Sequence, residues 1–465
     1  MKYPNESVTQ AIYTDRFPNS TGNPFLEALP EPIDKNTFFS LIRSFPVLPD
    51  CITSMNAADR RSHLTSLLSF FFPMEYMYNI YDLLYRTITI SCTTKTVLNS
   101  VRQLNFVHSN FRAGNLSSTM YSGQAECNSI LGVPGIGKTS TVMRCLDLFP
   151  QVIIHTNYKG TPFFTKQITY LTIECPSDCS IKTLAYNIAA AVDRAIGSEY
   201  FDRLSRLRSA SVSAIATQIK IICINHHIGV LVIDEIQNAV ITAQKNKQTK
   251  PLIRFLVELT NDTSTGICFM GTIEAEEVFT SQEHLKRRTR GLRLLPLKPG
   301  ITYQNFLSTL WSYQFTIHKT ELSDKLANQF YDRSSGIPFY LIKLFYEAQS
   351  QAILTGYEKI DYAMLKLASE RLNIQIPKIF SHGTYISDFS FSSHPNENKE
   401  ENFPAGQPML LQGNVQTHRL YANPRGRKKV QRDTADLIEM FKRCQTAEKM
   451  VNEIKQCGLM EELKI

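Results

Sequence analysis

The chain has 465 residues, of which 43% are hydrophobic, and a formal net charge of +8. This length exceeds what one hydrophobic core usually organises, so we expect two or three structural units. No apolar run approaches the ~20 residues of a membrane-spanning helix, and the N-terminus lacks the layout of a signal peptide. The ten cysteines are scattered, and several lie in apolar segments, which suggests reduced core residues. Together these points predict a cytoplasmic protein with no membrane association.

The N-terminal part divides into an arm and a helical region. Residues 1–35 are rich in Pro, Asn, Ser and Thr and show little periodicity, which predicts an extended arm. Residues 36–103 repeat apolar side chains at helical spacing, which predicts a helical N-terminal domain. Residues 104–125 are polar, and we expect a connection there.

A phosphate-binding loop follows the first predicted strand, which ends at Leu131. Residues 132–139 fit the pattern G-x-x-x-x-G-K-[ST], whose glycines let backbone N–H groups point at a triphosphate. Lys138 would reach the β- and γ-phosphates, and Thr139 would offer its hydroxyl to Mg²⁺. A helix predicted over Thr139–Phe149 aims its positive end at the same anion. The expected ATP-binding residues are Gly132, Pro134, Gly135, Ile136, Gly137, Lys138, Thr139 and Ser140.

Two acids at the end of another apolar strand complete the predicted site. Residues 230–233 are all apolar, as in a strand buried on both faces of a parallel sheet, and Asp234 and Glu235 follow. Beside the phosphate loop, Asp234 would hold Mg²⁺ through water. Glu235 would orient and polarise the attacking water, so that hydrolysis depends on positioning and electrostatics. Considered alone, the segment is equally consistent with an ordinary strand that ends in an acidic turn.

Alternating strands and helices continue to about residue 300 and predict one parallel sheet. Further strands are expected at Gln167–Glu174, Gly266–Gly271 and Leu292–Leu297. Pro296 places the last of these at an edge of the sheet. Helices are expected at Ile181–Ile196, Val212–Ile224 and near Pro251–Leu259. The predicted fold class is therefore α/β, with a five-stranded parallel sheet in a P-loop NTPase core at residues 104–300.

Three segments follow the core. Residues 301–380 have helical spacing with a break at Gly336-Ile337-Pro338, which predicts a small helical lid. Residues 381–432 are rich in Asn, Ser, Pro and Gly and end in a basic cluster, which predicts a disordered linker. Residues 433–465 contain apolar side chains at a-and-d spacing over Asp436–Glu462. This amphipathic helix would either dock to a partner or fold back on the lid.

The order of these parts resembles the AAA+ ATPases. The resemblance implies that Thr272, at the end of the fourth strand, helps to place the attacking water. It also implies that Arg287 or Arg288, before the fifth strand, acts on the γ-phosphate of a neighbouring subunit in a homo-oligomer. A solvated helix end or a DNA-facing charge is the other interpretation of these arginines.

The lid departs from the AAA+ pattern at one position. Many AAA+ lids carry an arginine in the helix after the break, whereas Phe339 follows the break here. Arg333 or Lys343 would have to supply that contact to the γ-phosphate.

A narrower resemblance is to the TnsC/TniB family of transposition regulators. The stretches that carry it are Gly22–Pro30, Tyr158–Thr165, Gln167–Leu171, Glu174–Lys182 and Gly271–Ala275. It covers the arm and most of residues 104–370. The family implies an ATP-dependent ring or helical filament that coats double-stranded DNA, reads a target-selection protein and licenses the transposase.

DNA contacts in such a filament should be made with phosphates, because a coat that covers many sequences cannot read bases. Lys182 and Thr183 open the helix after the second strand, at the sheet edge expected to face a duplex. Each is equally consistent with an ordinary surface residue. Two other functions share this core, namely a regulatory switch NTPase that binds only proteins and a replication loader of initiator type.

Overall fold

The structure is a computed structural model that describes residues 7–15, 22–113, 125–206, 210–239, 249–276 and 289–372. The linker predicted at 381–432 and the helix predicted at Asp436–Glu462 lie outside these ranges. So do Arg287 and Arg288, the two candidates for an arginine that acts on a neighbouring subunit.

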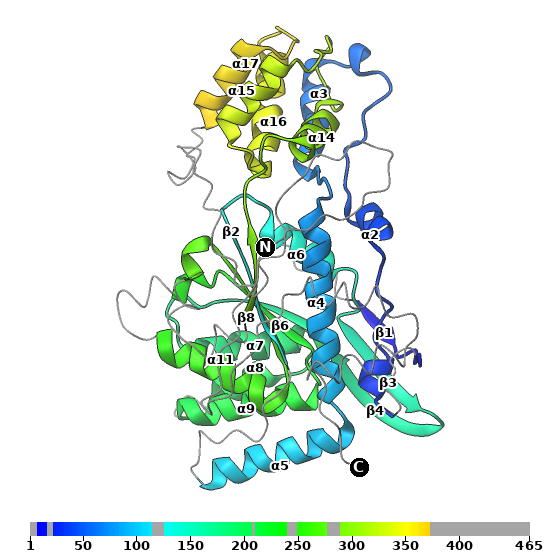
Figure 1. Cartoon of the computed structure of the whole chain (residues 1–465), viewed down its shortest axis with the longest axis vertical. Helices are drawn as coiled ribbons and strands as arrows, with labels where there is room; N and C mark the ends of the chain where they lie inside the picture. The colour runs from blue at the N-terminus through cyan, green and yellow to red at the C-terminus, as the bar shows by residue number, and fades with distance from the viewer. Residues whose placement is uncertain are drawn as a thin grey trace, which may run out of the picture. The chain divides into compact units, whose positions relative to one another are not determined.

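A five-stranded parallel sheet lies at the centre of the described residues (Figure 1). Its strands are β2 (Cys127–Gly132), β5 (Tyr170–Glu174), β6 (Val230–Asp234), β7 (Gly266–Gly271) and β8 (Thr289–Leu294). They pair in the order β5-β6-β7-β2-β8, and every pair is parallel. The predicted α/β class with a five-stranded parallel sheet is confirmed, and β8 lies at an edge as expected.

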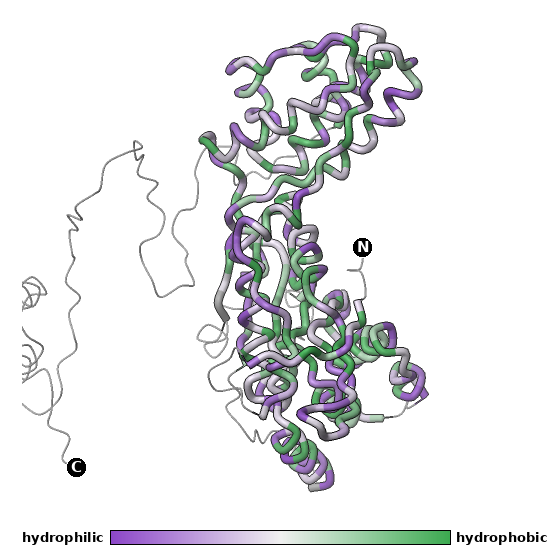
Figure 2. The backbone as a smooth tube through the Cα atoms, turned by 90° about the vertical axis from the view of Figure 1, so that its right-hand side faces the viewer, coloured by the Kyte–Doolittle hydropathy of each residue, from purple (hydrophilic) through white to green (hydrophobic). Residues whose placement is uncertain are grey.

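Helices cover both faces of the sheet. Successive strand residues point to opposite faces, so Met270 belongs to the same cluster as Ile88 of α4 (Glu75–Thr94), while Phe269 belongs to a second cluster. The helices of that second cluster are α7 (Ile181–Ile196), α8 (Tyr200–Arg206), α9 (Val212–Asn225) and α11 (Thr249–Thr263). Along the helices hydrophobic and hydrophilic residues intermix (Figure 2), since only one side of each helix faces the sheet. Among the described helices, none combines the length and the apolar character that a membrane crossing requires.

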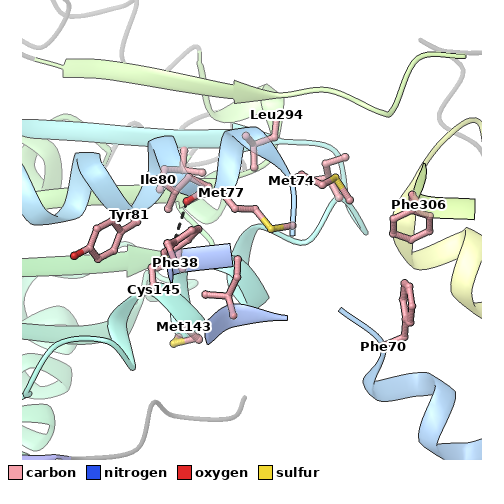
Figure 3. Close-up of a cluster of buried hydrophobic side chains, with 14 of the residues drawn as sticks. Phe38, Phe70, Met74, Met77, Ile80, Tyr81, Met143, Cys145, Leu294 and Phe306 are labelled. Carbon is pink, nitrogen blue, oxygen red and sulfur yellow. Dashed lines mark hydrogen bonds between the residues drawn. The ribbon is translucent and has the colours of Figure 1, made fainter. Parts of the chain in front are cut away.

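Among the helices between the arm and β2, one packs directly on the large sheet and the others pack on neighbouring helices. These helices are α2 (Lys35–Ile42), α3 (Ala57–Leu64), α4 and α5 (Val97–Ala113), with 3-10 turns η1 (Ile52–Ser54) and η2 (Thr65–Ser69). Figure 3 shows Phe38, Met77, Tyr81 and Cys145 gathered between α2, α4 and α6 (Lys138–Leu146). The Cys145 thiol donates to the Met77 carbonyl at 3.8 Å.

The prediction of a polar connection from residue 104 is wrong as far as Ala113. Helix α5 continues through this stretch because it packs against α9 and buries Val107. The mostly polar composition reflects its exposed side.

A second, smaller sheet binds the N-terminal arm. It consists of β1 (Val8–Gln10), β3 (Val152–Tyr158) and β4 (Thr161–Ile168), paired in that order. The strand predicted at Gln167–Glu174 therefore divides into the end of β4 and the whole of β5. In the arm, α1 (Pro24–Glu27) buries Glu27, whose carboxylate accepts a hydrogen bond from Tyr158 at 2.9 Å. The arm is thus attached by backbone and side-chain bonds.

The edge strand ends earlier than predicted. The strand expected at Leu292–Leu297 is β8, which ends at Leu294. Its last pairing is between Leu294 and Gly132, and the Leu297 amide donates instead to the Gly336 carbonyl at 2.9 Å. The chain leaves the sheet because residues after Leu294 bond to the helices that follow.

The helical lid contains α14 (Ile301–Trp311), α15 (Asp324–Ser334), α16 (Pro338–Leu354) and α17 (Tyr362–Leu372). Helix α3 and turn η2 pack against α16, so part of the N-terminal region contacts the lid (Figure 1). Phe70 meets Phe306 of α14 edge to face, with ring centroids 5.6 Å apart (Figure 3). Such aromatic pairs add to the stabilisation that burial alone supplies.

A buried ion pair fixes α3 to the lid. The Arg60 guanidinium donates to both carboxylate oxygens of Glu358 at 2.5 and 2.6 Å, and also to the Phe315 carbonyl at 3.3 Å. Burial alone would raise the pKa of Glu358, but hydrogen bonds from Arg60 and the Ile317 amide outweigh it and lower that pKa. The two charges are satisfied only while α3 and the lid stay together.

We therefore expect Arg60→Met to destabilise the protein by about 3 kcal/mol, because Glu358 is left buried and unpaired. Thermal and urea unfolding measure the effect. The matched control is Arg61→Met, since Arg61 is the exposed neighbour on the same helix. Equal unfolding midpoints for the two variants would contradict this account.

The same pair predicts a pH dependence. The folded pKa of Glu358 lies below its ordinary value of 4.5, so the stabilisation is present above that pH and is lost as the pH falls through the folded pKa. The stability difference between the parent and Glu358→Gln should accordingly shrink in acid. Urea midpoints for both proteins at pH 7 and pH 3.5 test it, and a constant difference would exclude the pair as its source.

Candidate functional site

The phosphate loop lies between β2 and α6 at the carboxyl edge of the large sheet. Gly135 and Gly137 have φ values of +82° and +97°, which residues with a side chain rarely adopt. Gly132 is constrained differently, because a Cβ there would lie 2.8 Å from the Leu294 carbonyl oxygen of β8. The three glycines therefore allow both the turn and the close approach of β8.

The N-terminus of α6 is open for an anion. Gly137 is its N-cap and supplies no side-chain hydrogen bond, so the first-turn N–H groups are left for a ligand. The Lys138 ammonium donates to the carbonyls of Gly132 and Val133 at 2.8 and 3.1 Å. Burial lowers the pKa of Lys138, while Asp234, Glu235 and Glu274 favour its charge. Among the described residues Lys138 forms no ion pair, and its ammonium is held over the loop where a phosphate would bind.

The predicted magnesium ligands are in contact. The Thr139 hydroxyl donates to Asp234 Oδ2 at 2.9 Å, across the gap between α6 and β6. Asp234 is buried, and its other oxygen accepts the Glu235 amide at 2.8 Å. A hydroxyl and a carboxylate beside a phosphate cradle match the oxygen ligands that Mg²⁺ prefers, so these residues fit the ion.

Glu235 and Thr272 are linked through a residue that the sequence did not indicate. The Gln237 side chain donates to the Glu235 carboxylate and accepts the Thr272 amide N–H at 3.1 Å. Glu235 itself has a φ of +58°, unusual for a residue with a long side chain. The exposed Glu235 carboxylate is thereby connected to the end of β7.

These residues line a cavity of about 890 Å³. Its floor includes residues 134–140, Asp234, Glu235 and Thr272. Its walls come from the N-terminal region, from α6 and from the lid, and include Phe70, Phe71, Phe72, Tyr76, Arg144, Phe306, Pro338 and Phe339. The volume suffices for a nucleotide.

The lid and the N-terminal region both contact the phosphate loop. The Phe339 amide donates to the Gly135 carbonyl at 3.2 Å, and the Tyr76 hydroxyl donates to the Ile136 carbonyl at the same distance. Arg144 of α6 stacks on Phe71 at 4.3 Å and donates to the Ile42 carbonyl. The sequence did not indicate these aromatic walls, because helical spacing alone cannot separate core from cavity-lining side chains.

Neither predicted lid cation lines this cavity. Arg333 donates to Gln329 and lies 5.4 Å from the ring centre of Tyr362. The Lys343 ammonium lies 5.9 Å from the ring centre of Phe339. A γ-phosphate contact from either residue stays a prediction.

Lys182 and Thr183 lie at the start of α7, whose N-cap is Ser180. The Thr183 hydroxyl donates to Asp178 Oδ2 at 2.9 Å. The loop before this helix is bonded to the predicted magnesium strand, since the Cys175 amide donates to the Asp234 carbonyl at 2.8 Å. The Asn238 side chain adds a second bond to the Cys175 carbonyl at 3.0 Å. The start of α7 is therefore tied to the end of β6.

Comparison with known proteins identifies the core. Residues 122–279 match the family described as AAA domain. With the phosphate loop and the parallel sheet described above, these residues form an AAA+ P-loop ATPase domain, an enzyme core that hydrolyses ATP. No protein among the curated sequences matches the chain.

The solved structures that the chain resembles share little sequence identity with it and superpose on it only in part. The chain is similar to the ORC2 protein of Aeropyrum pernix, with 12% identity over 58% of this chain and 66% of that chain and a TM-score of 0.34. It is similar to Drosophila ORC bound to DNA, with 12% identity over 59% of this chain and 61% of that chain and a TM-score of 0.32. It is also similar to Cdc6p of Pyrobaculum aerophilum, with 15% identity over 59% of this chain and 67% of that chain and a TM-score of 0.34. The chain spans less than two thirds of the first two, and similarity at this level says nothing about function.

Replacing Lys138 tests the nucleotide site. Lys138→Ala should weaken ATP binding at least tenfold, because the cation held over the loop is lost. The parent should melt at a higher temperature when ATP and Mg²⁺ are added, and the variant should lose this shift. Lys298→Ala, which removes an exposed lysine outside the cavity, is the control. Parent-like ATP binding by Lys138→Ala would show that the triphosphate lies elsewhere.

Proposed function

We propose that the protein is an ATP-dependent, DNA-binding regulator of transposition, similar in action to the TnsC/TniB proteins that its sequence resembles. It would assemble as a ring or helical filament on double-stranded DNA, link a target-selection protein to the transposase, and be reset by ATP hydrolysis. All eight cysteines among the described residues are free thiols, which suits the cytoplasm.

One observation favours this function most. The segment that resembles the family, residues 174–182, is hydrogen-bonded to the strand that carries Asp234. A duplex phosphate bound at the start of α7 by Lys182 and Thr183 would act one short loop away from the magnesium site. Binding of DNA and turnover of ATP would then be coupled through Cys175 and Asn238, because any shift of the loop moves the end of β6.

The hydrolytic chemistry follows from the positions of the side chains. The loop amides and Lys138 would hold the β- and γ-phosphates of ATP. Thr139 and Asp234 would hold Mg²⁺, which neutralises charge that develops on the phosphate oxygens. Glu235 would orient the attacking water with help from Thr272, and Arg287 or Arg288 would reach the γ-phosphate of a neighbouring subunit.

Two alternative functions make different predictions. A protein-binding switch without DNA contacts would hydrolyse ATP at the same rate with and without duplex. An initiator-type replication loader would depend on a helicase rather than a transposase. ATPase assays with and without duplex, followed by pull-down with each candidate partner, separate the three functions.

The first test of the proposal uses a variant that should bind ATP without hydrolysing it. Glu235→Gln keeps the shape of the side chain but cannot polarise water, so ATP should bind and hydrolysis should fall by two orders of magnitude or more. The variant should then remain on duplex DNA after the parent has dissociated. Electron microscopy with duplex and ATP, and a filter-binding time course, measure both. Rapid turnover by this variant would place the water-orienting group elsewhere.

The second test concerns the DNA contacts. Affinity for duplex should fall steeply with salt and vary little with sequence, because counterions are released from phosphates. If Lys182 neutralises one phosphate, Lys182→Ala should reduce the slope of log K against log salt by about 0.9. The control is Lys166→Ala, an exposed lysine on the small sheet. A strong sequence preference with weak salt dependence would exclude a DNA-coating filament.

A further inference from the structure

We propose that Gln237 is a positioning residue for ATP hydrolysis, whose side-chain amide holds the carboxylate of Glu235 at a fixed place relative to Thr272. This inference rests on the proposed role of Glu235 as the residue that orients the attacking water. Gln237 also lines the cavity, and its two side-chain hydrogen bonds are to Glu235 and Thr272.

The orientation of the amide is determined by its partners. The Thr272 backbone N–H can only donate, so the oxygen of the Gln237 amide must face it, and the measured N···O distance is 3.1 Å. The amide nitrogen then faces Glu235, whose carboxylate can only accept. A glutamine meets both requirements at once, whereas a glutamate at this position would present a second negative charge to Glu235.

The backbone around Gln237 is built to hold this bridge. The Ile236 amide donates to the Met270 carbonyl at 2.9 Å, so the turn after β6 is fixed to the end of β7. A Cβ on Gly271 would lie 2.6 Å from Gln237 Oε1, so the bridge occupies space that only glycine leaves free. Glu235 adopts its left-handed backbone conformation within this same turn.

The bridge matters because Glu235 is exposed. A free glutamate side chain samples several rotamers, and fixing it costs entropy that would otherwise add to the barrier of every turnover. The hydrogen bond from Gln237 restricts the carboxylate before ATP binds. Because Thr272 holds the other end, the two residues predicted to place the attacking water keep a constant separation.

The direct test is Gln237→Ala, measured as steady-state ATPase activity in the presence of duplex DNA. We expect kcat to fall about tenfold or more, because a carboxylate displaced by about 1 Å loses much of its effect on the water. KM for ATP should stay within about twofold of the parent value, since the phosphate loop and Lys138 are unchanged. Gln218→Ala, an exposed glutamine on α9, is the matched control.

A second variant gives a readout that a merely structural role would not produce. Gln237→Met keeps the length and packing of the side chain but cannot donate a hydrogen bond to Glu235. If Gln237 acts only through packing, Gln237→Met should hydrolyse ATP like the parent. If Gln237 positions Glu235, kcat should stay about tenfold low while KM for ATP and the melting temperature remain near the parent values.

The outcomes separate this inference from the proposed role of Glu235. An inactive Glu235→Gln together with a fully active Gln237→Ala would overturn the inference and leave the role of Glu235 in place. Parent-like hydrolysis by Glu235→Gln would overturn that role first. If Gln237→Ala unfolds or loses ATP binding, Gln237→Met decides, and a parent-like kcat for Gln237→Met overturns the inference.

Discussion

The parallel register of β6, β7 and β2 is the constraint on which the rest of the site depends. Leu131 pairs with Gly271 and Ile233 pairs with Phe269, so the three strands end at one edge of the sheet. Every group of the site leaves from that edge, namely the phosphate loop after β2, the two acids after β6 and Thr272 after β7. A slip of one residue in any strand would turn its side chains to the opposite face and separate these groups.

The sequence predicted the parts of the site whose chemistry depends on local spacing. The loop glycines, Lys138, Thr139 and Asp234 occur within short motifs at the ends of apolar strands, and the structure brings these elements together. What the sequence could not predict depends on contacts between distant segments. Phe70 and Phe339 line the cavity, yet each sits in a pattern that equally describes a core residue.

The predicted ends of helices and strands were wrong where contacts between distant segments override the local sequence pattern. The last strand lies at an edge of the sheet as predicted, but β8 ends before Pro296, because the Leu297 amide bonds to Gly336 instead of to the sheet. The polar residues after 104 stay helical because α5 packs against α9. The role of Gln237 could not be predicted for a related reason, since its partner Thr272 is remote in sequence and only the register of β6 and β7 brings them together.

The ion pair between Arg60 and Glu358 has a mechanical consequence. It joins α3 to the lid, so the backbone passes between this combined body and the sheet at three places, near residues 42–45, 70–74 and 295–300. A domain on a single tether can swivel in any direction, whereas a body attached at three points has much less rotational freedom. Because α3 and the lid form one body, the cavity walls from the N-terminal region and from the lid would shift together rather than part from each other.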